Sequence, residues 1–409
     1  MVTATHRDAD QSGASMRVIM TAGAIVLALS FGVRSVFGGV LSPLSADMGW
    51  PREVFSLSLA IQNLVWGLSQ PFFGIIADKY GDRPALWLGF GCYLVGMIMA
   101  VIGMSPMMQH LGAGVFVGMG VAGTAFGLVL AVVGRASSPE KRSQNLGFVA
   151  ALGSLGQVVM PFAASVLISA YDWRVMLIVM TALLVPMVFC IPFLQAAPPP
   201  HTTPAQDAAA ERSIMETLVH AAGYRSYLLL TLGFFVCGFH VTFISVHFPA
   251  FISEMCGDPA LGLQALSVIG AMNVVGTLAA GHLGALFPKN YVLSVIYALR
   301  ALVIFVFISF PVTPLSVILF AASIGPLWLS TVPLTSGLVA GMFGPKHMAT
   351  LYGFVFLSHQ VGSFVGVYFG GVLYDAYNSY DIVWWSAIVL GIAAAIVHLP
   401  VREEVAETA

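Results

Sequence analysis

Ser30-Phe-Gly-Val-Arg34-Ser-Val-Phe-Gly-Gly-Val-Leu-Ser-Pro43 places an arginine inside an apolar stretch that runs from about residue 18 to residue 44. A charged side chain at the centre of a membrane-spanning helix costs about 2.5–3.5 kcal/mol on insertion scales. Such residues are rare in membrane helices and usually serve a function. Arg34 is therefore the first candidate for a binding residue.

A related segment occurs 206 residues later, as Gly238-Phe-His240-Val-Thr-Phe-Ile-Ser-Val-His247-Phe-Pro249. The two segments align with Gly32 over Gly238, Arg34 over His240 and Pro43 over Pro249. Internal repeats of this length are typical of transporters built from two related halves. We expect Arg34 and His240 to face each other across a substrate path between these halves.

The composition is that of a polytopic membrane protein. Of the 409 residues, 58% are hydrophobic and only 8% are charged, against about 25% charged in soluble proteins. The net charge of −2 gives no indication of nucleic-acid binding. The cysteines lack paired spacing, so we expect buried free thiols and neither disulfides nor a metal site. The four cysteines are Cys92, Cys190, Cys237 and Cys256.

A membrane-spanning helix needs about 20 apolar residues, and by this rule the chain holds twelve. We therefore predict an all-α membrane protein with twelve transmembrane helices in two pseudo-symmetric six-helix bundles. The predicted spans are 18–44, 54–77, 85–104, 108–134, 145–170, 173–194, 225–252, 261–286, 290–310, 313–341, 348–374 and 380–400.

The basic residues predict the orientation. With both termini in the cytoplasm, twelve of the sixteen Lys and Arg residues fall on the cytoplasmic side, as the positive-inside rule requires. Residues 1–17 lack the pattern of a cleaved signal peptide, so the first helix should be retained. We expect a bacterial-type inner (plasma) membrane location. The predicted divisions are a cytosolic tail (1–17), a six-helix bundle (18–194), a cytosolic linker (195–224), a second bundle (225–400) and a tail (401–409).

The loop after the second span reads Gly74-Ile-Ile-Ala-Asp78-Lys-Tyr-Gly81-Asp-Arg83-Pro84, and a degenerate copy follows the eighth. Gly74 would let two helices approach closely, and Gly81 would permit a tight turn. Asp78 would face a helix N-terminus or a basic side chain. The alternative is a plain turn whose charges only enforce topology.

With this loop, the repeat and the twelve spans, the chain resembles the major facilitator superfamily over nearly its whole length. The resemblance implies transport by rocking one half against the other. It also implies that Asp78 and Arg83 help to hold the outward-open state together. It further implies that the first and seventh spans line the cavity.

The first span and the following Met48-Gly-Trp50-Pro-Arg-Glu-Val-Phe-Ser resemble bacterial relatives of the monocarboxylate and oxalate/formate transporters. Those families often carry a cation on the first helix and a Gly-Trp before the second. The eighth span, however, has Asn273 where mammalian-type carriers have charged residues. The fourth and fifth spans lack the arginine and the Gly-Pro element typical of proton-driven drug exporters, which favours small anions over multidrug export.

Placed on the predicted spans, none of the eighteen acidic residues lies near a helix centre. Arg34 therefore has no carboxylate partner at its depth, and an unpaired cation in an apolar cavity favours an anion. We expect its planar guanidinium to hold a carboxylate. His240 would add a second donor and carry the co-transported proton. The alternatives are an arginine bonded to backbone carbonyls and a histidine satisfied within the bundle.

Other polar and aromatic residues complete the candidate site. His247 would serve as proton entry or gate, or lie at the membrane interface. The amides would bind substrate, or only bridge helices. We expect Arg300, on the ninth span, to turn inward in a structural role. The remaining candidate substrate-binding residues are Gln62, Asn63, Asn273, His359, Gln360, Phe31, Phe243 and Trp328, for which packing is the alternative.

These observations predict a secondary transporter of a small organic anion, with a monocarboxylate as the first candidate and proton symport as the expected mechanism. We expect a monomer in the lipid bilayer that needs no cofactor. Triad and metal-ligand spacings are absent from the sequence, so an enzyme is not expected. An exporter of hydrophobic or toxic compounds is the first alternative, and a non-transporting sensor is the second.

Overall fold

The structure, a computed structural model, consists of helices and has no β-strand in the part of the chain that it describes. Twelve helical segments are long and apolar enough to cross a membrane. Each begins and ends within about one helical turn of the span predicted from the sequence. The predicted all-helical architecture is thus confirmed. The structure describes residues 15–138, 141–195, 216, 218–343 and 348–403.

The N-terminal half holds the first six spans, four of which are divided into shorter helices. The undivided spans are α3 (Arg52–Tyr80) and α4 (Asp82–Ile102). The first span is α1 (Met16–Ser35) and α2 (Phe37–Met48), and the fourth is α5 (Pro106–Gln109), the π-helix η1 (His110–Phe116), α6 (Val117–Thr124) and α7 (Phe126–Ala136). The fifth and sixth are α8 (Arg142–Ser154), α9 (Gly156–Ala170), α10 (Trp173–Ala182), α11 (Met187–Cys190) and η2 (Ile191–Phe193).

The C-terminal half holds the last six spans, and only the tenth is divided. The undivided spans are α13 (Arg225–Cys256), α14 (Pro259–Leu286), α15 (Lys289–Ser309), α18 (Met348–Tyr377) and α19 (Asp381–His398). The tenth consists of α16 (Pro314–Ile324), the 3₁₀-helix η3 (Gly325–Leu327) and α17 (Thr331–Phe343). The break leaves backbone carbonyls that need partners inside the bundle.

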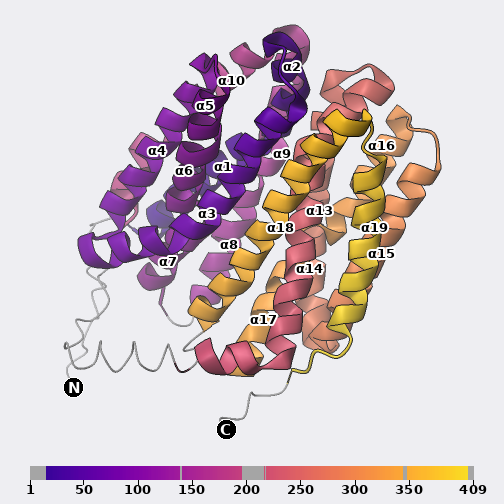
Figure 1. The fold of residues 1–409 in the computed structure, drawn as a ribbon. Coiled ribbons are helices and arrows are strands. Elements are labelled where there is room, and N and C mark those ends of the chain that lie inside the picture. The colour runs from indigo at the N-terminus through magenta and orange to yellow at the C-terminus, as the bar shows by residue number, and fades with distance from the viewer. Residues whose placement is uncertain (1–14, 139–140, 196–215, 217, 344–347, 404–409) are drawn as a thin grey trace, which may run out of the picture.

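The two halves lie side by side, with α3, α9, α13, α14 and α18 near the boundary between them (Figure 1). Helix α3 packs along α18, and α9 packs along α14. We call the end at which α1 begins and α19 ends the terminus end, and the opposite end the far end. Any opening of a path at the far end must separate these pairs.

Glycines at equivalent positions set the packing inside each half. In the N-terminal half, a Cβ on Gly32 would lie 2.8 Å from the carbonyl oxygen of Gly156. In the C-terminal half, a Cβ on Gly238 would overlap the carbonyl of His359, and one on Gly362 would overlap Phe235. Gly156 and Gly362 are separated by the same 206 residues as Gly32 and Gly238. The sequence repeat therefore corresponds to a repeated helix crossing.

The predicted divisions of the chain stay predictions. Most of the predicted linker at 195–224 lies outside the described residues. The same is true of residues 1–14 and 404–409, which make up most of the two predicted tails.

Candidate substrate site

Arg34 lies in the last turn of α1, directly before the break between α1 and α2. Its Nη2 donates a hydrogen bond of 2.5 Å to Oδ1 of Asn63 on α3. Its Cζ lies 4.8 Å from the centre of the Trp66 ring, a cation–π contact. The Nε atom is buried and has no hydrogen-bond partner in the described part of the protein.

The partners of Arg34 are thus neutral, as the positions of the acidic residues predicted. The ion pairs among the described residues do not include it; they are Arg52–Glu254, Arg135–Asp82, Arg174–Asp47 and Lys289–Glu403. A guanidinium that is partly removed from water and not neutralised attracts an anion. Within the described residues, the Arg34 guanidinium bonds to a side-chain amide, and not to backbone carbonyls as in the alternative.

A polar chain links Arg34 to the C-terminal half. The Asn63 side chain accepts from Arg34, and its backbone oxygen accepts from Nε2 of Gln360 on α18 at 2.9 Å. The other side-chain atom of Gln360, Oε1, lies 3.0 Å from Nδ1 of His359. Four of the predicted site residues therefore lie in one connected group across the boundary between the halves.

Aromatic rings enclose this group. The ring centre of Trp66 lies 5.7 Å from that of Phe31 and 5.3 Å from that of Phe356. Phe126 packs against Phe31 at 4.6 Å, and Phe356 stacks on His359 at 5.7 Å. The sequence did not point to Phe126 or Phe356, because aromatic residues are frequent throughout these helices. Together the rings form an apolar surrounding on one side of the guanidinium.

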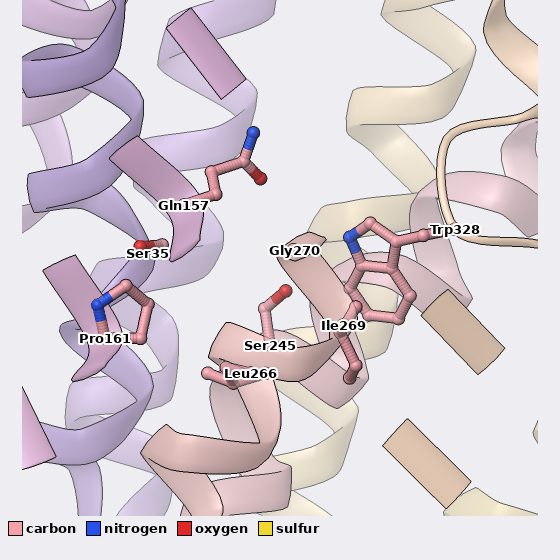
Figure 2. Close-up of a pocket in the computed structure, with 8 residues that line it drawn as sticks. All are labelled: Ser35, Gln157, Pro161, Ser245, Leu266, Ile269, Gly270 and Trp328. Carbon is pink, nitrogen blue, oxygen red and sulfur yellow. The ribbon is translucent and has the colours of Figure 1, made fainter. Parts of the chain in front are cut away.

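A small cavity also lies between the halves, close to the α1–α2 break (Figure 2). Ser35 and Gln157 face it from the N-terminal half, and Ser245 and Trp328 from the C-terminal half. Its volume of about 20 Å³ is room for about one water molecule. The structure therefore shows the boundary between the halves closed at this level, with polar groups on both sides. The cavity is lined by Ser35, Gln157, Pro161, Ser245, Leu266, Ile269, Gly270 and Trp328.

His240 does not face Arg34, and this expectation was wrong. Its Nε2 lies 2.7 Å from the carbonyl oxygen of Ala387 on α19, inside the C-terminal half. The ring fits there because Gly391 has no side chain; a Cβ at that position would lie 3.2 Å from Cε1 of His240. The geometry corresponds to the alternative of a histidine satisfied within the bundle.

Three other candidates have partners other than Arg34. Gln62 donates to the carbonyl of Ala113 at 2.7 Å, which is helix bridging within the N-terminal half. Asn273 accepts from the backbone N–H of Leu329 at 2.9 Å, at the break of the tenth span. The ring of Phe243 packs against Trp384 at 4.9 Å inside the C-terminal half. We expected direct substrate contacts from these residues, and their positions do not favour them.

Arg300 supports the same break in the tenth span. Its Nε and Nη2 donate to the carbonyl of Leu327 at 2.9 and 2.5 Å, and Nη2 also donates to the carbonyl of Trp328. Arg300 is 1% exposed. This arrangement agrees with the expected structural role. The carbonyls of Leu327 and Trp328 lie at the break, where the helix itself provides no N–H donors for them.

At the far end, polar residues of the two halves meet around Arg52, the first residue of α3. Arg52 forms an ion pair with Glu254 of α13 and donates to the Tyr380 hydroxyl at 2.8 Å. That hydroxyl lies 3.2 Å from Nδ1 of His247. His247 is thus part of the far-end closure, and Arg52 is a central residue of this closure that was not among the predicted site residues.

Comparison with known proteins adds the family. A family model described as Major Facilitator Superfamily matches residues 23–332. The chain belongs to the major facilitator superfamily. It is 24% identical over 390 residues to the uncharacterized MFS-type transporter YcxA of Bacillus subtilis (strain 168), covering 90% of each chain. It is 25% identical over 408 residues to monocarboxylate transporter 13 of Rattus norvegicus, covering 97% of this chain and 91% of that protein.

One further sequence relative and one solved structure are also similar to this chain. Multidrug resistance protein D of Escherichia coli (strain K12) is 26% identical over 221 residues, which cover 51% of this superfamily member and 53% of that protein. A crystal structure of the nucleoside transporter NupG has the same fold, with a TM-score of 0.76 at 13% identity over 94% of this chain and 99% of that one. These proteins are transporters, and this chain is a transporter rather than an enzyme.

The loop that first suggested the major facilitator superfamily has a mixed outcome. Gly81 has a φ of 95°, which confirms the tight turn. A Cβ on Gly74 would meet nothing within 4 Å, so the expected close helix approach there was wrong. The Asp78 side chain lies outside the described residues, and the gating role of Asp78 and Arg83 stays a prediction. The structure adds an ion pair between Asp82 and Arg135.

Proposed function

We propose that this superfamily member is a secondary transporter of a small organic anion, and that Arg34 holds the carboxylate of that anion. The observation that carries the proposal is the guanidinium itself. It lies at the boundary between the halves, bonds to a neutral amide and retains a buried Nε–H with no partner in the described structure. The likeness to a monocarboxylate transporter supports a monocarboxylate as the substrate.

The chemistry of binding follows from the arginine. A carboxylate that approaches Arg34 would accept from Nε and from an Nη atom, the bidentate geometry that suits these two planar groups. The Asn63 amide would then accept from the remaining Nη or yield to the ligand. The rings of Trp66, Phe31 and Phe356 lower the local dielectric constant, which strengthens the ion pair.

The polar chain gives this site a way to act on both halves. Asn63 accepts from Arg34 and also from Gln360 of the other half. The first bond is to the side chain of Asn63 and the second to its backbone oxygen, so an anion that shifts α3 at this residue would change a contact between α3 and α18. We propose that this coupling contributes to alternating access, in which the far end and the terminus end open in turn.

We further propose proton symport, with both termini in the cytoplasm of a bacterial-type cell and the far end facing outward. His240 is the less favoured proton carrier because it is buried inside the C-terminal half against Ala387 of α19, away from the boundary between the halves. His359, connected to Arg34 through Gln360 and Asn63, and His247 at the far end are the histidines whose positions favour this role.

The test is uptake of radiolabelled monocarboxylates into proteoliposomes. Changing Arg34 to Gln should lower initial uptake by about a hundredfold, because two charge-assisted hydrogen bonds are lost. A matched control is Arg174→Gln, which removes an arginine that pairs with Asp47 inside the N-terminal half and should leave uptake unchanged. Undiminished uptake by Arg34→Gln would refute the anion site. Transport of hydrophobic compounds that survives this change would favour an exporter instead.

A further inference from the structure

We propose that Arg52 is the centre of a latch that closes the far end, and that protonation of His247 releases this latch. The proposal assigns a proton-binding residue and its conformational effect, and it rests on the proposed alternating access but not on the identity of the substrate. Its members come from both halves, so they separate whenever the far end opens.

The side chain of Arg52 belongs to α3 but its main partners belong to the C-terminal half. It pairs with Glu254, donates to Tyr380 at 2.8 Å and lies 3.8 Å above the ring of Tyr374. Tyr374 in turn donates to Glu254 at 2.7 Å. Arg52 is 8% exposed, whereas the Glu254 side chain is 36% exposed, so the guanidinium is protected from water while the carboxylate stays in reach of solvent and salt.

The start of α3 has a second tie to the C-terminal half. The Asp375 carboxylate of α18 accepts from the backbone N–H of Arg52 at 3.0 Å and from that of Glu53 at 2.6 Å. The residue at the N-cap position, Pro51, has no side-chain cap bond. A residue of one half thus caps a helix of the other, and separation would leave two N–H groups without this partner.

The Tyr380 hydroxyl connects the latch to His247, and the direction of each hydrogen bond is fixed. The guanidinium can only donate to Tyr380, and the carbonyl of Val367 can only accept from Nε2 of His247 at 2.8 Å. Burial raises the pKa of the Tyr380 hydroxyl above its ordinary range, so it keeps its proton. It therefore donates to Nδ1 of His247 at 3.2 Å, and the ring is neutral.

A proton on Nδ1 is incompatible with this arrangement. Nδ1 would become a donor, so the Tyr380 oxygen would face two donors while its own proton lost its acceptor. A second positive charge would also stand beside Arg52. Within the described residues, the ring nitrogens of His247 bond to Tyr380 and Val367 and not to a carboxylate. The charged and titratable groups around this region are Arg52, Glu53, Glu254, Tyr374, Asp375 and Tyr380.

Protons and opening are therefore linked. The closed latch holds His247 neutral, whereas an opened far end would let water reach the ring and a proton bind. A ligand that binds one of two states better shifts the population toward that state. A proton from the side that the far end faces would thus promote opening toward that side.

The experiment measures the distance between the halves at the far end by double electron–electron resonance, without substrate. Spin labels would be placed at Tyr171 of the N-terminal half and Leu315 of the C-terminal half, which are 67% and 69% exposed. The full-length protein would carry Cys256→Ser, since Cys256 is the one partly buried cysteine and the other three are buried.

We expect the ratio of open to closed populations to rise about tenfold between pH 8 and pH 5.5, as for an open-state histidine of ordinary pKa near 6.5. Changing His247 to Gln preserves one donor and one acceptor, and should abolish this response. Changing Glu254 to Gln should raise the open fraction at pH 8 by about tenfold. Changing Arg174 to Gln removes an ion pair that lies at the same end but within one half. This variant should change neither the pH response nor the open fraction at pH 8.

Two results would overturn the proposal. One is a wild-type distance distribution that does not respond to pH, and the other is a His247→Gln variant that responds like the wild type. Because no substrate is present, these results do not depend on whether Arg34 binds an anion. If the protein does not take up monocarboxylates, the distance at the far end would still respond to pH. If the distance does not respond to pH, uptake through Arg34 would still be expected.

Discussion

Arg34 and Arg300 lie in similarly apolar surroundings, yet their guanidinium groups have different partners. Arg300 donates to the carbonyls of Leu327 and Trp328 at the break of the tenth span. Arg34 donates to one neutral amide and lies over the ring of Trp66. The guanidinium of Arg300 thus supplies donors to carbonyls that the helix break leaves free, although its Nη1 has no partner among the described residues. The guanidinium of Arg34 bonds to a single amide and lies at the boundary between the halves, where a ligand can reach it.

This difference predicts different consequences of substitution. Changing Arg300 to Met should lower the stability of the folded protein by about 1–3 kcal/mol, because buried carbonyls lose their donor. Thermal unfolding of the purified protein in detergent would show a lower midpoint for this variant. Arg34→Met should leave the midpoint unchanged or raise it, because it removes a partly buried cation that has no anionic partner. Equal losses in both variants would contradict the distinction.

At the level of the helices, the crossings depend on where glycine permits contact. Gly362 lies where α18 meets α13, and a Cβ there would overlap the Phe235 carbonyl. Gly353 lies on the same helix, and a Cβ there would meet nothing within 4 Å. The two positions therefore form a matched pair within one element.

Changing Gly362 to Ala should destabilise the protein, by about 1–3 kcal/mol as expected for overpacking, because the backbones of α13 and α18 must move apart. Gly353→Ala should be neutral or slightly stabilising, since alanine is the better helix former. Thermal unfolding of both variants under the same conditions is the measurement. A Gly362→Ala variant as stable as Gly353→Ala would contradict the packing between α13 and α18.

Hydropathy was enough to predict the twelve spans, because a bilayer imposes the length of each helix. The positions of the acidic residues likewise predicted that Arg34 has no acidic partner. Side-chain direction was harder to predict. His240 aligns with Arg34 in the repeat but turns to α19, where Gly391 leaves room for its ring. Position along a helix can be predicted from the residues more reliably than the neighbour that a side chain meets.

The network of polar residues at the far end also could not be predicted from the sequence. Arg52, Glu254, Asp375 and Tyr380 are far apart in the chain, and each is an ordinary residue for a helix end. The packing of α3 against α18, and of α13 against α18 and α19, brings them together. Conversely, Gly74 was expected at a close crossing because glycine has no side chain, and the structure leaves open space beside it.

Across the whole molecule, the two halves meet in two polar groups at different depths. One is the chain from Arg34 through Asn63 to Gln360, and the other is the cluster around Arg52. A transporter that alternates between two openings must rearrange both. We propose that the first responds to the anion and the second to the proton.

Binding of a monocarboxylate to the purified protein tests the role of Arg34 without the added steps of transport. Thermal-shift screening of acetate, lactate, pyruvate and benzoate would select a ligand, and isothermal titration calorimetry would then measure its dissociation constant. We predict saturable binding by the wild type and by Arg174→Gln, with affinity about a hundredfold weaker in Arg34→Gln. Equal affinity in wild type and Arg34→Gln would contradict the proposal that Arg34 holds the anion.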